Sequence, residues 1–229
     1  MKTREFITRR VPGLLPVLLV VLLQFACYCI PKVLIPDVAR IFIDSPLDDA
    51  IPFIPAFVVF YLGAFVQWAI YYLHLAAAKP AERYPFLAAE IAAKLIGAVC
   101  FVAFPVSMVR PDVVGEGFFL WLMRIVYGVD GPICLFPSFH TMLSMFSTLR
   151  VFGDERAGTP AKVGSALFTL GVCASTVLVK QHLFMDAVAG VVLALACYFL
   201  VRQTKFVCVT QRLFESINAK VLGIHEEDR

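Results

Sequence analysis

Charged residues are scarce in this sequence. Only 16% of the 229 residues are charged, whereas 60% are hydrophobic and the mean hydropathy is +0.83. A soluble domain of ordinary composition carries about 25% charged residues. This scarcity excludes an ordinary soluble domain, and a net charge of only +3 gives no reason to expect a nucleic-acid partner. We expect a single membrane-embedded domain over residues 1–229.

The seven cysteines lack any spacing typical of a metal site. Most of them lie within apolar runs, where a thiol behaves as a small hydrophobic group. The sequence also has no low-complexity segment and no convincing internal repeat. It therefore predicts neither a zinc module nor a repeat protein, and no cofactor is expected.

Long apolar runs, in contrast, are abundant. Six of them approach the roughly 20 residues that a helix needs to cross a bilayer. They predict an all-α fold, a bundle of six transmembrane helices at residues 13–30, 53–75, 86–105, 137–152, 160–177 and 183–203. The first run has a basic start like that of a signal peptide. It has no obvious small-x-small cleavage site, so we expect it to be retained as a span.

Two further segments have a mixed character. Residues 113–128 are too short and too interrupted by Gly, Glu and Arg to span, which is typical of an interfacial or re-entrant piece. Residues 204–229 alternate charged and apolar side chains, which predicts a cytoplasmic amphipathic tail on the membrane surface. Neither segment adds a span to the six.

Basic residues are unevenly distributed between the two sides of this layout. The N-terminus, the loops around residues 79–83 and 150–162, and the tail hold most of the Lys and Arg residues. Because cytoplasmic loops are the richer in Lys and Arg, both termini are expected in the cytoplasm. The loop at 31–52, which carries four Asp residues, then lies on the outer side.

The same layout gathers polar residues on the extracytoplasmic side. His140 opens the fourth predicted span, and the fifth span returns the chain to the same side, where the sixth begins near His182. Arg110 follows the third span, while Lys180 and Asp186 flank His182. Cationic groups gathered at one depth favour the binding of an anionic headgroup.

His182 and Asp186 have the spacing of a nucleophile and the residue that orients it. At i and i+4 they share one helix face, and a carboxylate that accepts the Nδ1 proton leaves Nε2 free to react. The helix start favours phosphate through its dipole and its free N–H groups. Ser138 adds a hydroxyl beside His140, and Arg110 adds a planar fork for phosphate oxygens. This set does not fit zinc, but it fits phosphoryl transfer through a phosphohistidine.

Simpler interpretations exist for the charged pairs. His182 and Asp186 are compatible with a structural ion pair, which a second histidine on the same side disfavours. Glu90 and Lys94, also at i and i+4, lie inside the third predicted span and are interpreted as a buried pair that stabilises the helix. Aromatic residues near the ends of the spans are typical of interface belts.

The histidine motifs resemble signatures of the type 2 phosphatidic acid phosphatase superfamily. Pro-Ser-Phe-His, which ends at His140, is similar to P-S-x-H, and S-T-V-L-V-K-Q-H-L-F-M-D, which ends at Asp186, is similar to S-R-x5-H-x3-D. The first signature, K-x6-R-P, is matched only by Arg110 and Pro111. The resemblance covers residues 105–190. The K-Q-H variant resembles a branch that contains lipid phosphotransferases, such as inositol phosphorylceramide synthase, and many bacterial phosphatases.

The resemblance implies an enzyme of a bacterial cell membrane that removes phosphate from a lipid phosphate or pyrophosphate at the extracytoplasmic face. Its partners are then its lipid substrate and the surrounding membrane lipids. His182 would attack phosphorus, oriented by Asp186, and His140 would protonate the leaving alcohol and then activate water. Three groups would hold the phosphate oxygens: Arg110, Ser138 and the backbone amide of Phe139.

Two positions depart from the signatures. Ala103 stands where the first signature has Lys, and Thr176 stands where the third has Arg, so two cations of the pattern are missing. Lys180, two residues before the nucleophile, is our candidate replacement. Two alternative functions stay open. One is a phosphotransferase in which an alcohol replaces water, and the other is a non-catalytic lipid-binding or transport protein on the same scaffold.

Overall fold

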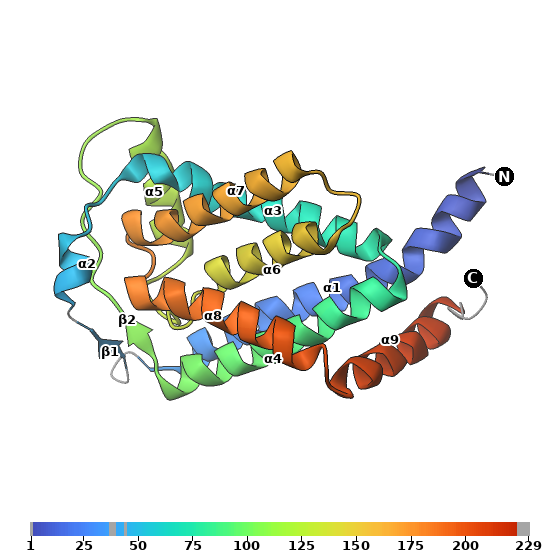
Figure 1. Cartoon of the computed structure of the whole chain (residues 1–229). Coiled ribbons are helices and arrows are strands. Elements are labelled where there is room, and N and C mark those ends of the chain that lie inside the picture. Colours follow the sequence, from blue (N-terminus) through green and yellow to red (C-terminus); the bar gives the residue numbers. More distant parts are fainter. Residues whose placement is uncertain (1, 37–39, 44, 224–229) are drawn as a thin grey trace.

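The chain is built almost entirely of helices. The computed structural model describes residues 2–36, 40–43 and 45–223, with side chains from Pro12 onward. Figure 1 shows the long helices running side by side, with the start of α1 and the end of α9 at the same end. The expected all-α class is confirmed. The elements are α1 (Lys2–Leu34), β1 (Ile41–Phe42), α2 (Pro46–Ala50), η2 (Pro55–Phe57), α3 (Val58–Ala77), α4 (Pro80–Ala103), β2 (Val106–Ser107), α5 (Phe118–Val129), α6 (Phe139–Gly153), α7 (Thr159–Leu178), α8 (Phe184–Val201) and α9 (Phe206–Leu222).

Five helical segments of the described chain are long and apolar enough to cross a membrane. No more than half of the most apolar part of each is buried inside the bundle, which suits helices whose outer faces contact lipid. The five support the expectation of a membrane protein with transmembrane helices. They are Pro12–Leu34, Pro55–Ala77, Pro80–Ala103, Thr159–Leu178 and Phe184–Val201.

The fourth predicted span forms a shorter helix than the other five. α6 has 15 residues. A helix of that length reaches about 22 Å, whereas the apolar core of a bilayer is about 30 Å thick. α6 lies inside the bundle, in contact with α3, α7 and α8 (Figure 1). The six-span count is therefore not confirmed.

The starts of α6 and α8 are in close contact. Ser138 caps α6, because its Oγ accepts a hydrogen bond from the Thr141 N–H at 3.4 Å. The Thr141 hydroxyl donates to the backbone oxygen of Ala187 in α8 at 2.9 Å. Gly190 permits the approach, since a Cβ there would lie 2.2 Å from the backbone oxygen of Ser138. These contacts bring the two segments that carry the histidine motifs side by side.

Residues 40–43 and 45–52, together with the chain after α4, cover this end of the bundle. β1 and β2 pair in parallel, with Ile41 opposite Val106. α2 follows, and Ser45 caps it through a hydrogen bond from the Asp48 N–H at 3.4 Å. Figure 1 shows α2, β1 and β2 at the end where α6 and α8 begin. Two of the four Asp residues predicted on the outer side, Asp37 and Asp44, lie outside the described residues.

A buried polar network joins α3 to α4. Lys94 Nζ lies 2.7 Å from Glu90 Oε2, and both side chains are fully buried. Tyr72 donates to the same carboxylate at 2.9 Å, and Tyr71 donates to its other oxygen. Lys94 also donates to the backbone oxygen of Val20 at 3.1 Å, which links α1 to the network. Each charged group of this pair thus has hydrogen-bond partners inside the bundle. This is what the interpretation of Glu90 and Lys94 as a structural pair requires.

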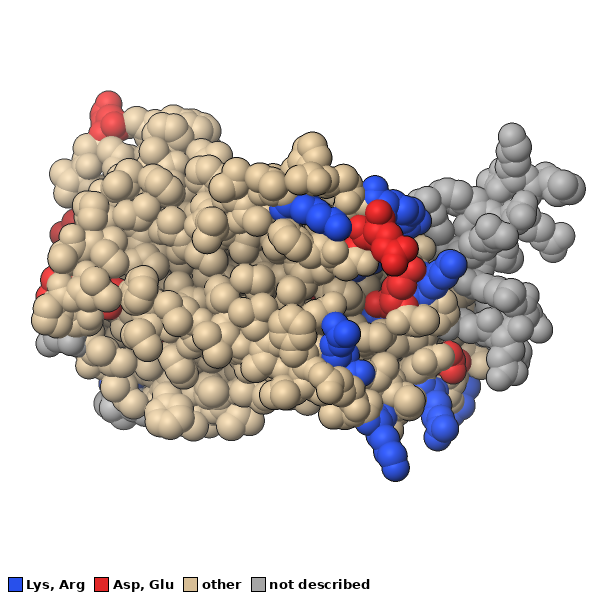
Figure 2. Space-filling view, viewed as in Figure 1, with Lys and Arg blue, Asp and Glu red and all other residues tan. Residues whose placement is uncertain are grey.

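Charged residues gather at the opposite end from α2. Figure 2 shows most of the visible Lys and Arg side chains toward the end where α9 lies. Arg150 at the end of α6 pairs there with Glu82 at 2.8 Å and lies 3.8 Å from Asp154. The visible charges at the end that carries α2 are mainly acidic (Figure 2). On the face shown in Figure 2, the two ends of the bundle thus differ in charge.

The predicted tail is helical from Phe206 to Leu222, and residues 224–229 lie outside the described residues. α9 packs on the bundle through Phe214, whose ring stacks on that of Tyr84 at 6.5 Å. Asn218 donates to the backbone oxygen of Pro12 at 2.8 Å. These contacts fix α9 against α4 and the start of the first candidate span.

Candidate active site

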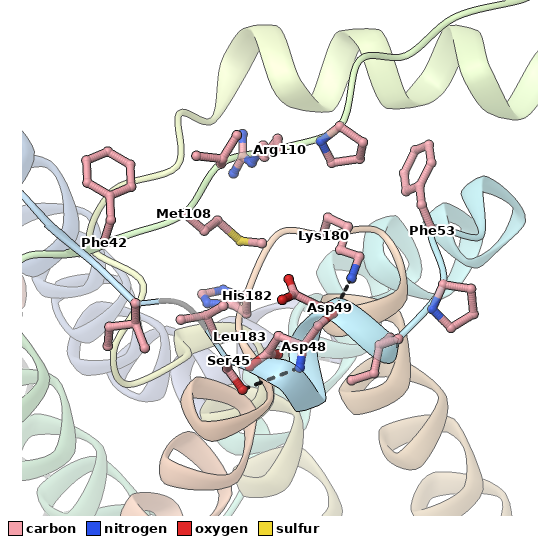
Figure 3. A pocket seen from close by; sticks show the side chains of 15 residues that line it. Phe42, Ser45, Asp48, Asp49, Phe53, Met108, Arg110, Lys180, His182 and Leu183 are labelled. Carbon is pink, nitrogen blue, oxygen red and sulfur yellow. Dashed lines mark hydrogen bonds between the residues drawn. The ribbon is translucent and has the colours of Figure 1, made fainter.

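A pocket opens at the end of the bundle where α6 and α8 begin. It holds about 470 Å³ and lies between α2, the chain around Arg110 and the turn that joins α7 to α8. Three of the predicted site residues line it, namely Arg110, Lys180 and His182. Asp48 and Asp49 of α2 also line it (Figure 3).

The turn between α7 and α8 places His182 in this pocket. The amides of Gln181 and His182 both donate to the backbone oxygen of Thr176 at 3.0 Å, which closes the turn. Nδ1 of His182 lies 3.0 Å from the backbone oxygen of Leu135. Because a carbonyl oxygen can only accept, Nδ1 carries the proton and Nε2 keeps a free lone pair. A nucleophilic histidine needs this tautomer.

Asp186 bonds to the start of α8 instead of to the imidazole. Its Oδ2 accepts a hydrogen bond from the Leu183 N–H at 2.8 Å and lies 3.7 Å from Nδ1 of His182. The longer distance exceeds that of a hydrogen bond. The direct bond expected from the spacing is therefore not present in this structure. Asp186 acts on His182 only through its negative charge.

Two amides at the start of α8 are occupied. The Phe184 N–H donates to Oδ1 of Asp48 at 2.7 Å, next to the Leu183 N–H that donates to Asp186. Both donors are therefore bonded to carboxylates. Two of the N–H groups that we expected to attract phosphate at this helix start are therefore already bonded.

His140 lies beside His182, as the predicted hairpin requires. The centres of the two imidazole rings are 6.2 Å apart. The His140 ring stacks on Tyr61 at 4.1 Å and lies 4.9 Å from the ring of Trp68, both in α3. Its Nε2 is buried and has no hydrogen-bond partner among the described residues. His140 itself is not among the residues that line the pocket.

Ser138 and Phe139 serve the helix and the core. The Ser138 side chain is fully buried, and its hydroxyl caps α6. The Phe139 ring packs 4.7 Å from that of Phe101, and a Cβ on Gly97 would come within 2.3 Å of it. Neither residue lines the pocket that holds His182. Their predicted contacts with phosphate oxygens have no counterpart in this pocket.

Acceptors from two other segments hold Arg110. Its Nη1 donates to the backbone oxygen of Asp130, and its Nη2 donates to the side-chain oxygen of Gln181. Its guanidinium carbon lies 4.7 Å from the centre of the Tyr127 ring. Burial lowers the pKa of Arg110, an effect that the nearby carboxylate of Asp130 opposes. A guanidinium has five N–H donors, so these two bonds leave donors for a ligand in the pocket.

Lys180 lines the pocket. The two signature positions that lack a cation, Ala103 and Thr176, contribute no charged side chain to it. Lys180 has a positive φ of 51°, and its Nζ donates to the backbone oxygen of Asp48 at 2.7 Å. Thr176 is fully buried, and its hydroxyl donates to the backbone oxygen of Cys173 at 2.8 Å. Ala103 is the last residue of α4. The cationic side chains that line the pocket are thus those of Arg110 and Lys180.

Asp130 has no role among the sequence-based predictions. Its Oδ1 accepts hydrogen bonds from Lys32 Nζ at 2.6 Å and from the Tyr28 hydroxyl at 2.5 Å. Burial raises the pKa of Asp130, but the hydrogen bonds from Lys32 and Tyr28 outweigh it and hold the pKa below its ordinary value. These partners lie 98 and 102 residues away in the sequence, so no local pattern indicates them.

Comparison of the chain with protein-family models, with curated proteins and with solved structures finds no match. Across the part of the chain that the structure describes, no group of three or more His, Cys, Asp or Glu residues could hold a metal ion. A functional assignment therefore draws on the geometry of the pocket and on the resemblance of the two histidine motifs.

Proposed function

We propose that this protein is a membrane lipid phosphatase, which acts on a lipid phosphate or pyrophosphate through a phosphohistidine. The observation that carries the proposal is the pair of imidazoles, 6.2 Å apart, of which His182 lines a pocket and keeps Nε2 free. Arg110 and Lys180 place positive charge in the same pocket. A protein that only binds lipid needs no free nucleophile next to a second histidine.

The proposed reaction has two steps. Nε2 of His182 attacks phosphorus while the P–O bond to the lipid alcohol breaks, and His140 gives its proton to the leaving oxygen. Water then gives a proton to His140 and attacks phosphorus, which breaks the P–N bond and frees His182. Arg110 and Lys180 balance the negative charge on the phosphoryl oxygens in both steps.

We also propose an arrangement for the membrane. α6 would complete a six-helix bundle with the five longer helices, with both termini in the cytoplasm and the pocket at the extracytoplasmic face of a bacterial cell membrane. The distribution of charge supports this orientation, since basic side chains gather at the end opposite the pocket (Figure 2). The acidic residues of α2 then lie on the outer side.

A phosphotransferase is the second candidate. The pocket volume of about 470 Å³ lies in the range that accommodates a whole small molecule, so an alcohol acceptor has room beside the phosphoryl group. The chemistry would be the same, except that His140 would deprotonate the acceptor alcohol instead of water. Analysis of lipid products in the presence of candidate acceptors separates transfer from hydrolysis.

Phosphate release from a panel of lipids tests the proposal. The full chain is purified in detergent and incubated with phosphatidic acid, phosphatidylglycerol phosphate, an isoprenoid pyrophosphate and a sphingolipid phosphate. We expect release from at least one of them, none with His182→Ala, and full activity with His74→Ala. His74 is a matched control, because it is an exposed histidine near the other end of α3. If no lipid gives more phosphate with the wild type than with His182→Ala, the phosphatase proposal is wrong.

A further inference from the structure

The pocket is lined by both cationic and acidic side chains. Arg110 and Lys180 supply two cationic groups, and Asp48 and Asp49 supply two carboxylates. Figure 3 shows Arg110 across the pocket from Asp48 and Asp49, while His182 and Lys180 lie nearer the two carboxylates. The four side chains together carry no net charge. This balance is unlike that of a site for a dianionic phosphate alone, which is built from cations and amide donors.

The acidic residues of α2 are held in place through Asp48. Lys180 donates to the backbone oxygen of Asp48 at 2.7 Å, and the Asp48 carboxylate accepts from the Phe184 N–H at 2.7 Å. Asp48 is only 8% exposed. Two hydrogen bonds across more than 130 residues of sequence thus tie α2 to the turn that carries His182. The carboxylates therefore belong to the wall of the site.

The carboxylate of Asp49 is not neutralised within the described chain. It is exposed to the pocket (Figure 3) and has neither an ion pair nor a hydrogen bond with another described residue. An uncompensated carboxylate this close to a phosphate site repels a dianionic ligand. It attracts a ligand that carries positive charge next to its phosphate, so it discriminates between the two.

We propose that this pocket recognises a lipid phosphate with an ammonium group within a few atoms of phosphorus. The phosphate would lie against Arg110 and His182, and the ammonium group against Asp49. This inference rests on the proposed function. The ammonium group belongs either to the lipid alcohol, as in a long-chain base 1-phosphate, or to the headgroup, as in phosphatidylethanolamine.

The same two-step reaction applies to a long-chain base 1-phosphate and to phosphatidylethanolamine. His182 forms the P–N bond as the P–O bond to the lipid alcohol breaks, and His140 protonates that alcohol. Water then displaces His182 and leaves its proton on His140. The phosphorus product is inorganic phosphate from the long-chain base 1-phosphate and phosphoethanolamine from phosphatidylethanolamine.

Binding to matched lipids tests the inference without turnover. The full chain with His182→Ala is titrated in detergent micelles with two pairs of lipids. Sphingosine 1-phosphate is compared with ceramide 1-phosphate, which lacks the charged amine, and phosphatidylethanolamine is compared with phosphatidylethanol. In at least one pair we expect the ammonium lipid to bind about fivefold more tightly, the scale of a partly exposed ion pair. Which pair responds identifies the source of the ammonium group.

Substitutions test whether Asp49, in α2, causes the preference for the ammonium lipid. Asp49→Asn in the His182→Ala background should remove the preference, whereas Asp112→Asn should retain it, because Asp112 is an exposed acid that does not line the pocket. Equal affinity within both pairs, or a preference that Asp49→Asn leaves intact, overturns the inference. The phosphatase proposal is decided separately, by phosphate release with His182 intact. Selective binding without release would reject the phosphatase and keep the ammonium site.

Discussion

The backbone oxygen of Leu135 accepts a hydrogen bond from Nδ1 of His182 at 3.0 Å, across 47 residues of sequence. Leu135 belongs to the segment that leads into α6, whose first turn carries His140. One stretch of chain thus positions one histidine and sets the tautomer of the other. Asp186, at 3.7 Å from Nδ1, is not required for this tautomer.

Asp186→Asn should therefore weaken the reaction without abolishing it. The tautomer is retained through Leu135, and an Asn side chain can still accept from the Leu183 N–H. The substitution removes a negative charge close to the imidazole of His182, which becomes positively charged in the reaction. We therefore expect kcat to fall about tenfold. Phosphate release at saturating substrate measures this.

A second substitution at this position separates the effect on stability from the effect on catalysis. Asp186→Ala also removes the cap of α8, so it should lower the free energy of unfolding by about a further 1 kcal/mol. Thermal unfolding in detergent separates this effect from the effect on kcat. If Asp186→Asn were as inactive as His182→Ala, the carboxylate and not Leu135 would be setting the tautomer.

Lys180→Ala should reduce kcat/KM roughly tenfold or more, because it removes one of the two cations that line the pocket. Lys180→Arg keeps the charge and should retain most of the activity. Lys162→Ala is the matched control, since Lys162 lies in the first turn of α7, at the other end from this site. Steady-state rates on the best lipid of the panel give the comparison. Wild-type kcat/KM in Lys180→Ala would show that Lys180 does not compensate for the cations missing at Ala103 and Thr176.

Sequence patterns predicted the long helices well, and the reason is physical. A membrane-spanning helix is a continuous apolar run, so five candidate spans lie close to their expected ranges. α6 was expected to span, but hydropathy alone does not distinguish a short helix in the interior from one that crosses the bilayer. The meeting of His140 and His182 followed from a hairpin, which depends only on helix order and direction.

The finer parts of the site could not be predicted in this way. Asp48 meets Phe184 across 136 residues, and Asp130 meets Lys32 across 98. Such contacts depend on how α2 and α5 fold back over the bundle, which periodicity does not encode. One predicted contact, the direct hydrogen bond between Asp186 and His182, is not formed. The i, i+4 spacing to His182 is correct, but the Leu183 N–H competes for the carboxylate and binds it.

Asp130 should make stability depend on pH. Its pKa in the folded protein is below the ordinary value of about 4, so its ionised form stabilises the fold above that pH. The contribution is lost as the pH falls through the folded pKa. In thermal unfolding in detergent, the Tm of the wild type should exceed that of Asp130→Asn by a constant margin from about pH 7 to pH 5. The margin should shrink below about pH 4. A margin that widens on acidification would contradict the hydrogen bonds to Lys32 and Tyr28.

Gly190→Ala should damage both the fold and the site. The new Cβ would lie 2.2 Å from the backbone oxygen of Ser138 and 2.3 Å from Oγ1 of Thr141, so α8 must move away from the start of α6. We expect the free energy of unfolding to fall by about 1–3 kcal/mol, the scale of an overpacked core. Phosphate release should fall with it, because α8 would move away from the start of α6, which carries His140. Thermal unfolding and the release assay measure the two effects.

Gly164→Ala is the control for this substitution. Gly164 lies within α7, and outside its own helix no described heavy atom lies within 4 Å of the position that an added methyl group would take, so alanine fits without displacement. Alanine is the better helix former by about 1 kcal/mol, and stability should stay the same or rise. Activity should not change. If Gly190→Ala behaved like Gly164→Ala, the starts of α6 and α8 would not be in contact, and the placement of His140 beside His182 would fall with that contact.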